Sequence, residues 1–205
     1  MKITGIILAA GLSNRMGEVK SLLPFGKSLL LGLVINNVWE SILSHTIVVL
    51  GSDADRIRKM IDFKDATVVF NPDYRRGQSS SLKAGLQAVD SDTDGVMFLL
   101  GDQPFIDPKL INTLIGEWRK QPAAIIIPVY DGKRGNPVVA HRNIFPMIRK
   151  ISGDSGLRQI FQKLKGDIRE VEIADPGILM DIDTVEDYRE LLLYAQKRQE
   201  EDDNT

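Results

Sequence analysis

Residues 8–20 read Leu-Ala-Ala-Gly-Leu-Ser-Asn-Arg-Met-Gly-Glu-Val-Lys, and they follow a short apolar run at residues 3–8. Such a run is typical of a buried strand. Gly11 and Gly17 can adopt backbone angles that other residues avoid, so several N–H groups behind the strand can turn toward one anion. Arg15 and Lys20 add a fixed and a mobile positive charge. The stretch therefore predicts a strand that ends in a phosphate-binding loop.

The spacing within this loop excludes the two commoner phosphate-binding motifs. A Walker A loop has four residues between its glycines and a lysine directly after the second glycine. Here five residues separate Gly11 from Gly17, and Lys20 comes three positions later. The G-x-G-x-x-G pattern is absent as well. The plainer interpretation is an ordinary glycine-containing turn between a strand and a helix. In either case we expect Lys20, as a loop lysine, to be mostly solvated in the free protein.

The remaining chain alternates strand-like and helix-like patterns, which predicts an α/β fold: a single-domain, Rossmann-like three-layer sandwich with a mostly parallel sheet. Strands are expected at 46–50, 66–70, 96–100, 125–129, 137–140 and, near a sheet edge, 168–173. Helices are expected at 29–43, 56–61, 79–89, 108–119, 144–151 and 157–164, and a last one follows Thr184. Asp107 and Thr184 are the expected N-caps. We expect one domain at 1–195 and a frayed polar tail at 196–205.

The composition of this 205-residue chain narrows the function classes. No cysteine and only two histidines are present, which excludes disulfides, thiolate nucleophiles and cysteine- or histidine-rich metal sites. A net charge of −2 argues against a nucleic-acid partner. The apolar run at residues 3–10 is too short for a membrane span and poorly shaped as a signal peptide. We therefore expect a cytoplasmic protein with no membrane partner.

A carboxylate follows the clearest strand of the sequence. Residues 96–100 run directly into Gly-Asp-Gln-Pro at 101–104. In an open α/β sheet, ligands gather beyond the carboxyl ends of the strands, so Asp102 is expected at the same edge as the Gly11 loop. A carboxylate beside a triphosphate loop is what a magnesium ion requires. The alternative is a solvated aspartate in a turn.

These stretches carry a family resemblance. Residues 8–20, continued by Leu-Leu-Pro-Phe-Gly at 22–26, resemble the signature of the MobA-like nucleotidyltransferases, which move a nucleoside monophosphate from an NTP to a phosphorylated acceptor. Residues 101–104, 134–138 (Arg-Gly-Asn-Pro-Val) and 153–158 (Gly-Asp-Ser-Gly-Leu-Arg) fit the molybdenum cofactor cytidylyltransferase branch. The resemblance extends from Ile3 to about Tyr194 and implies a GT-A-like nucleotidyltransferase fold.

The resemblance implies three groups of site residues. Those implied in catalysis are Lys20, Arg15 and Asp102. The nucleotide-binding set is Leu8, Ala9, Ala10, Gly11, Ser13, Arg15, Lys20, Gly77, Ser79, Ser80 and Ser81. The acceptor-binding set is Arg134, Gly135, Asn136, Pro137 and Asp154. Plainer alternatives stay open: the three serines are equally suited to capping a helix, Arg134 to being a solvated charge, and residues 152–156 to forming a turn between helices.

The resemblance also implies Mg²⁺ as cofactor, with a late aspartate joining Asp102 as ligand. Asp181 and Asp183 both qualify, because alternation along an extended segment places them on the same side. We prefer Asp183, which directly precedes the Thr184 cap, where the chain can turn a side chain toward the pocket. The alternative is that Asp183 only complements the dipole of the last helix.

The implied reaction transfers CMP from CTP to the terminal phosphate of molybdopterin carrying molybdenum, with a molybdoenzyme as recipient of the product. CTP is implied because alanines stand at positions 9 and 10, where the guanylyl branch tends to have two glycines. Methyl groups there are expected to narrow the space beside the base. The alternatives are a guanylyltransferase, a sugar-phosphate nucleotidyltransferase on the same fold, or a non-catalytic carrier of the cofactor.

Overall fold

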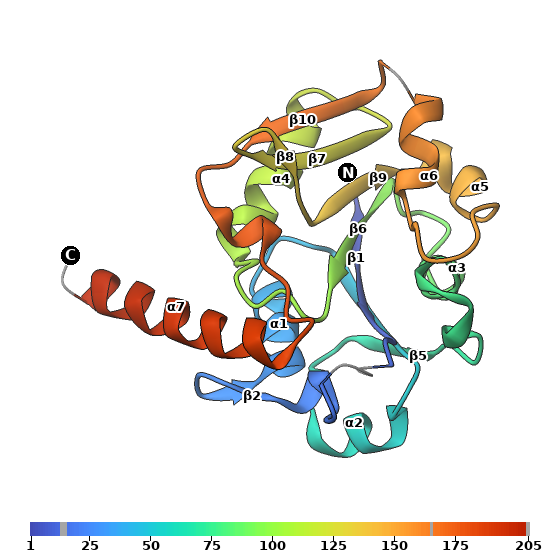
Figure 1. Cartoon of the computed structure of the whole chain (residues 1–205). Coiled ribbons are helices and arrows are strands. Elements are labelled where there is room, and N and C mark those ends of the chain that lie inside the picture. Colours follow the sequence, from blue (N-terminus) through green and yellow to red (C-terminus); the bar gives the residue numbers. More distant parts are fainter. Residues whose placement is uncertain (13–15, 165, 204–205) are drawn as a thin grey trace.

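An eight-stranded mixed sheet forms the centre of the computed structural model, which describes residues 1–12, 16–164 and 166–203, with side chains described up to residue 200 (Figure 1). Its strands are β1 (Ile3–Ala9), β4 (His45–Leu50), β5 (Thr67–Phe70), β6 (Gly95–Leu100), β7 (Ile125–Tyr130), β8 (Lys133–Arg134), β9 (Val138–His141) and β10 (Ile168–Glu172). The order across the sheet is β10-β7-β9-β6-β1-β4-β5, and β8 pairs with β7. All the strands predicted from the sequence are present, with ends shifted by at most one residue, and β10 lies at a sheet edge as predicted.

The strand directions bring the candidate site residues to one edge of the sheet. β1 runs parallel to β4 and β6, β4 to β5, and β7 to β10, whereas β9 runs antiparallel to both β6 and β7. The predicted mostly parallel sheet is therefore confirmed. Leu8 pairs with Leu100, and the Gly101 N–H donates to the Leu8 carbonyl at 3.0 Å. This pairing places the loop after β1 beside the loop that holds Asp102.

Helices cover both faces of the sheet and complete the three layers. Helices α1 (Leu30–Trp39), α2 (Ala54–Met60) and α4 (Pro108–Lys120) pack on one face, and α3 (Gln78–Gln87), α5 (Phe145–Ile148) and α6 (Arg158–Phe161) pack on the other. Successive side chains of β1 alternate between these two cores: Ile7 and Ala9 enter the first, and Ile6 and Leu8 pack in the second. Burying an isoleucine side chain of this kind stabilises the fold by about 1.5–3 kcal/mol.

A third, smaller apolar cluster lies beside the site, and we call it the α7 cluster. It joins the hairpin of β2 (Pro24–Phe25) and β3 (Ser28–Leu29) to the last helix, α7 (Val185–Asp203), which lies along the lower left of Figure 1. Its buried members are Met16, Leu23, Phe25, Leu30, Phe105, Ile182 and Leu191. Phe105 packs edge-on against Phe25, with ring centroids 5.9 Å apart, and against Tyr194 at 5.0 Å. The Tyr188 hydroxyl donates to the Pro24 carbonyl at 2.6 Å.

The predicted helix caps are confirmed, while several helix lengths differ from the prediction. Asp107 Oδ1 accepts from Leu110 N at 2.7 Å, and Thr184 Oγ1 accepts from Asp187 N at 3.1 Å. The helix expected at 29–43 ends at Trp39, where the Ser41 hydroxyl donates back to the Val38 carbonyl. Such a bond competes with the next turn of the helix.

The two helices expected at 144–151 and 157–164 are single turns, each extended by a 3-10 turn. Helix α7 continues to Asp203 and so includes most of the stretch for which the sequence predicts fraying. The domain boundary at residue 195 stays a prediction. Across the described residues, no helix combines the length and apolar character needed to cross a bilayer.

Candidate active site

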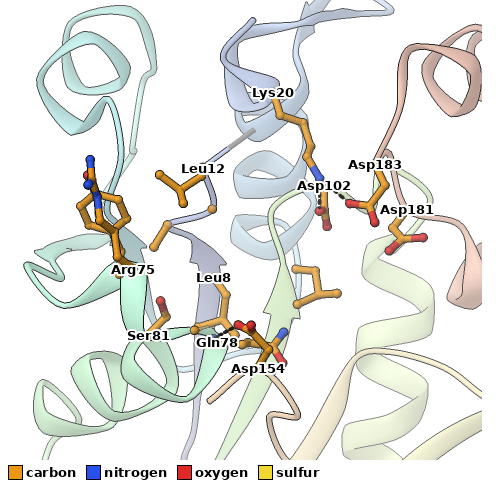
Figure 2. Close-up of a pocket in the computed structure, with 15 residues that line it drawn as sticks. Leu8, Leu12, Lys20, Arg75, Gln78, Ser81, Asp102, Asp154, Asp181 and Asp183 are labelled. Carbon is orange, nitrogen blue, oxygen red and sulfur yellow. Dashed lines mark hydrogen bonds and ion pairs between the residues drawn. The ribbon is translucent and has the colours of Figure 1, made fainter. Parts of the chain in front are cut away.

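Lys20 is the centre of a compact ionic group. It begins a 3-10 turn, Lys20–Leu22, at the end of the stretch predicted to bind phosphate. Its Nζ lies 2.8 Å from Asp102 Oδ2 and 2.9 Å from Asp183 Oδ1 (Figure 2). Only 16% of its side chain is exposed, so the expectation of a mostly solvated lysine is wrong. Burial alone would lower the pKa of Lys20, but the two carboxylates outweigh it, and the pKa is raised.

A backbone hydrogen bond explains how two distant aspartates meet at Lys20. The Ile182 N–H donates to the Asp102 carbonyl at 3.1 Å, which fastens the segment before α7 to the loop after β6. The Ile182 side chain is fully buried in the α7 cluster. Since side chains alternate along this segment, its two neighbours, Asp181 and Asp183, face the same cavity. The predicted meeting of Asp102 with Asp183 is thus present in the structure, and Asp181 lies beside them.

The two carboxylates that contact Lys20 have the chemistry to hold a divalent cation. Asp102 Oδ1 is buried and has no hydrogen-bond partner among the described residues, which leaves one oxygen suited to a metal. Burial, followed by the charges of Asp102 and Asp183, raises the pKa of Asp181. Within the described residues, no three acidic or histidine side chains converge as a ready metal site. Mg²⁺ commonly uses one or two carboxylates plus substrate phosphates and water, so Asp102 and Asp183 fit this ion.

A cavity of about 490 Å³ opens beside this ionic group. Figure 2 shows Lys20 and the three aspartates at one end, and Gln78, Ser81 and Asp154 at the other. The lining residues are Leu8, Ala10, Gly11, Leu12, Lys20, Tyr74, Arg75, Gly77, Gln78, Ser81, Leu100, Asp102, Asp154, Asp181 and Asp183. The structure thus brings together six of the predicted nucleotide-binding residues, namely Leu8, Ala10, Gly11, Lys20, Gly77 and Ser81.

The other predicted nucleotide-binding residues lie elsewhere or outside the described ranges. Ala9 faces the opposite core, because side chains alternate along β1. Ser79 is buried, and the Ser80 hydroxyl donates to the Gly77 carbonyl at 2.8 Å; neither lines the cavity. Ser13 and Arg15, the latter also predicted to be catalytic, lie outside the described residues.

The N-terminus of α3 is capped from another part of the chain rather than by its own serines. The N-cap residue is Gly77, at φ 93°, which has no side chain with which to cap the helix. The backbone N–H of Gln78 donates to Asp154 Oδ1 at 3.2 Å, and the backbone N–H of Ser79 donates to the Gly153 carbonyl at 3.1 Å. The capping interpretation of Ser79, Ser80 and Ser81 is therefore wrong. A side chain at position 77 would collide with Asp154 and Gly153, so glycine is needed there.

A second cavity, of about 290 Å³, adjoins the first. The two share five lining residues: Leu8, Gln78, Leu100, Asp154 and Asp181. Of the predicted acceptor set, Arg134, Gly135, Asn136 and Asp154 line this second cavity, together with Arg158 and the aromatic Phe98 and Phe161. Pro137 follows a cis peptide bond and is buried, and it is not part of the lining.

Arg134 is held by neighbouring side chains rather than by solvent alone. Its Nη2 lies 2.6 Å from Glu170 Oε1, and its guanidinium lies 5.7 Å from the centroid of the Phe161 ring. Its side chain is 45% exposed, so Arg134 is a solvated charge that also pairs with Glu170, and its role toward the acceptor stays a prediction. Gly135 packs so closely that a Cβ atom would lie 2.5 Å from the Ile178 carbonyl oxygen. The loop is thus fixed in place beside the second cavity.

Sequence reasoning missed several residues that line the cavities, among them Tyr74, Arg75 and Gln78 in the first. Tyr74 packs where Gly51 has no side chain: a Cβ there would lie 2.6 Å from the Tyr74 Cβ. The Arg75 guanidinium lies 5.7 Å from the centroid of the Tyr74 ring. The available signal was an aromatic residue and two arginines in the turn-rich segment just before the Gly77 position.

Asp154 both caps α3 and lines the two cavities. Asp154→Ala removes the cap on α3 and is expected to lower the unfolding free energy by about 1 kcal/mol. It should also raise KM for nucleotide and acceptor, because both cavities lose a shared wall. Asparagine caps helices as well as aspartate does, so Asp154→Asn is expected to restore both KM values. Steady-state kinetics with both substrates, together with thermal melting, provide the check.

Asp107→Ala is the matched control, because Asp107 caps α4 and lines neither cavity. It should lower stability by a similar amount without changing either KM. If Asp154→Asn is as impaired toward the acceptor as the alanine variant, the carboxylate charge itself contacts the acceptor and the capping role is secondary.

Comparison with known proteins agrees with this geometry. The chain is 30% identical over 184 residues to the molybdenum cofactor cytidylyltransferase of Escherichia coli strain K12, which covers 89% of this chain and 92% of that protein. It is 34% identical over 130 residues to a "Probable molybdenum cofactor guanylyltransferase" of Natranaerobius thermophilus, covering 63% and 62%. The structure of Rv0371C from Mycobacterium tuberculosis H37Rv in complex with manganese is similar at a TM-score of 0.81 and 28% identity, covering 94% and 98%. Residues 5–168 match the MobA-like NTP transferase domain, and the chain therefore belongs to the MobA-like NTP transferase family.

Proposed function

We propose that the protein transfers CMP from CTP to the terminal phosphate of molybdopterin carrying molybdenum, with release of pyrophosphate. The observation that supports this most strongly is the position of Lys20, Asp102 and Asp183 in the first cavity, which shares a wall with the second. One cavity then takes the nucleotide and the other the acceptor. Since nucleoside triphosphates are held inside cells, the proposed reaction implies a cytoplasmic location.

The proposed reaction is an in-line displacement. An oxygen of the acceptor phosphate forms a bond to the α-phosphorus of CTP, and the bond from that phosphorus to the bridging oxygen breaks. Pyrophosphate leaves with the electron pair of that bond. The acceptor phosphate already carries negative charge, so no covalent enzyme intermediate is needed. The chief obstacle is repulsion between two anions, and the residues of the site act on that charge.

Each group of residues has a part in this proposal. The backbone N–H groups near Gly11 and the ammonium of Lys20 bind the triphosphate and oppose its growing charge. Asp102 and Asp183 would hold Mg²⁺, which supplies further neutralisation of the phosphates when bound. Leu8 and Leu100 line both cavities and give their junction an apolar part.

The second cavity suits an aromatic acceptor that carries a phosphate. Phe98 and Phe161 give it an apolar part, and Arg158 adds positive charge at its lining. Arg134 is paired with Glu170, so we assign the acceptor phosphate to Arg158 before Arg134. A molybdoenzyme that takes the product remains part of the proposal.

The proposed preference for CTP rests on one alanine rather than two. Ala10 lines the first cavity, whereas the methyl group of Ala9 points into the opposite core. A methyl group at position 10 leaves less room for a purine than a glycine would. We therefore expect kcat/KM for CTP to exceed that for GTP, measured as pyrophosphate release with Mg²⁺ and purified acceptor.

Ala10→Gly provides the internal comparison, because it removes only that methyl group. It is expected to raise use of GTP relative to CTP. Equal use of both nucleotides by the unmodified protein, or a preference for GTP, would favour the guanylyltransferase alternative. Absence of pyrophosphate release with every NTP would favour the non-catalytic carrier, although the presence of Lys20 and Asp102 argues against it.

A further inference from the structure

We infer that Lys20 occupies, in the nucleotide-free protein, the position that a divalent cation takes when nucleotide binds, so that metal and nucleotide enter together. The inference rests on the proposed function only in taking a metal–nucleotide complex as the ligand. It concerns what the lysine does before the reaction, which the catalytic role of Lys20 leaves open.

The ammonium group of Lys20 lies between two carboxylates. Its nitrogen lies 2.8 Å from Asp102 Oδ2 and 2.9 Å from Asp183 Oδ1, and therefore bridges the two carboxylates that fit Mg²⁺. A Mg²⁺ ion binds carboxylate oxygens at about 2.0–2.1 Å, so an ion that bridges the same two oxygens would overlap the ammonium group. The two cations also repel each other. Either Lys20 or a metal can hold this position, and not both.

The surroundings of the ammonium group are rich in negative charge. Three carboxylates, those of Asp102, Asp181 and Asp183, gather at this end of the cavity, and Lys20 offsets part of their charge. Asp102 keeps one buried oxygen, Oδ1, without a hydrogen-bond partner in the described part of the chain. Among the described residues, this group therefore holds three carboxylates against one ammonium group. It is poised to accept a doubly charged cation once the lysine leaves.

When nucleotide binds, the ammonium group of Lys20 can move from the carboxylates to the triphosphate. Lys20 follows the phosphate loop on a flexible side chain and lines the same cavity as Gly11. A triphosphate at Gly11 offers the ammonium group new oxygen partners and also brings phosphate ligands for the metal. Nucleotide binding thus removes the occupant of the metal position and supplies the missing ligands. The two ligands are coupled positively, each raising the affinity for the other.

Binding of Mn²⁺ alone tests this exchange. Free Mn²⁺ is measured by electron paramagnetic resonance in titrations of the unmodified protein, Lys20→Met and Lys27→Met, without nucleotide or acceptor. Lys27 is an exposed lysine on the β2–β3 turn, so its variant makes the same change of charge away from the cavities. We expect Lys20→Met to bind Mn²⁺ about 10-fold more tightly than the unmodified protein, and Lys27→Met to bind it unchanged. Adding Asp102→Asn to Lys20→Met should abolish the gain.

Unchanged or weaker Mn²⁺ binding by Lys20→Met would overturn the exchange, as would an equal gain in Lys27→Met. If Lys20→Met fails to fold, Lys20→Gln keeps a hydrogen-bond donor at the position and removes only the charge, and the same gain is expected. The measurement contains no CTP and no acceptor. Failure of CTP turnover therefore leaves this result standing, and normal CTP turnover with no gain in Mn²⁺ affinity overturns the exchange alone.

Discussion

Lys20→Ala is expected to lower kcat by about 100-fold or more, because it removes a positive charge from the place where charge builds up during phosphoryl transfer. Saturating nucleotide should not restore the rate. The burial of Lys20 adds a second effect that a solvated lysine would not have. The variant leaves Asp102 and Asp183 facing each other without their shared ammonium group. These groups are partly exposed, so we expect a loss of about 1–2 kcal/mol in unfolding free energy.

Pre-steady-state and steady-state rates at saturating CTP provide the measurement for Lys20→Ala, with thermal melting in parallel. Lys27→Ala is the matched control and should retain both rate and stability. A kcat within a few-fold of that of the unmodified protein would remove Lys20 from the catalytic group, whatever the change in stability.

Asp102→Asn is expected to lower kcat by a similar factor and to raise the Mg²⁺ concentration that gives half-maximal activity. Asparagine keeps the size of the side chain and one carbonyl oxygen, but it lacks the charge that attracts a metal. Asp102 is the better buried of the two proposed ligands, with 24% of its side chain exposed against 41% for Asp183. We therefore expect the larger effect at Asp102. Magnesium titrations of activity on both variants measure it.

Asp183→Asn and Asp181→Asn complete this series. If Asp183 is a metal ligand, Asp183→Asn should raise the Mg²⁺ concentration that gives half-maximal activity, with little change in melting temperature. As a charge at the start of α7, it should lower stability modestly and leave the magnesium dependence unchanged. A larger magnesium shift in Asp181→Asn than in Asp183→Asn would exchange the roles of these two aspartates.

The sequence was most informative where a residue's role depends on its distance from the end of a strand. Apolar periodicity located β1 and β6, and parallel pairing then brought Gly11 and Asp102 to one edge. The Thr184 cap located the start of α7, and with it Asp183. These inferences need only local pattern and the rule that parallel strands share a carboxyl edge.

The sequence was least informative where a role depends on contacts between distant segments. Lys20 is buried by contacts with Asp102 and Asp183, which lie 82 and 163 positions further along the chain. No local sequence pattern predicts contacts between such distant segments. The serines of α3 looked like caps, yet Asp154, which lies 76 positions after Gln78, provides the cap. Tyr74 contacts the cavity only because Gly51 leaves room for it. The antiparallel direction of β9 likewise cannot be read from the short apolar run at residues 137–140.

The α7 cluster has a consequence for how the protein loses activity on heating. Met16 and Leu23 flank Lys20, Phe105 follows Asp102 closely, and Ile182 separates Asp181 from Asp183. The small cluster thus anchors all three segments that carry the charged groups. Small apolar clusters open at a lower free-energy cost than a central sheet does. Detachment of α7 would disperse the ionic group while the sheet stays intact, so inactivation by heat and unfolding of the sheet become two separate transitions, with fast amide exchange in α7 accompanying the first.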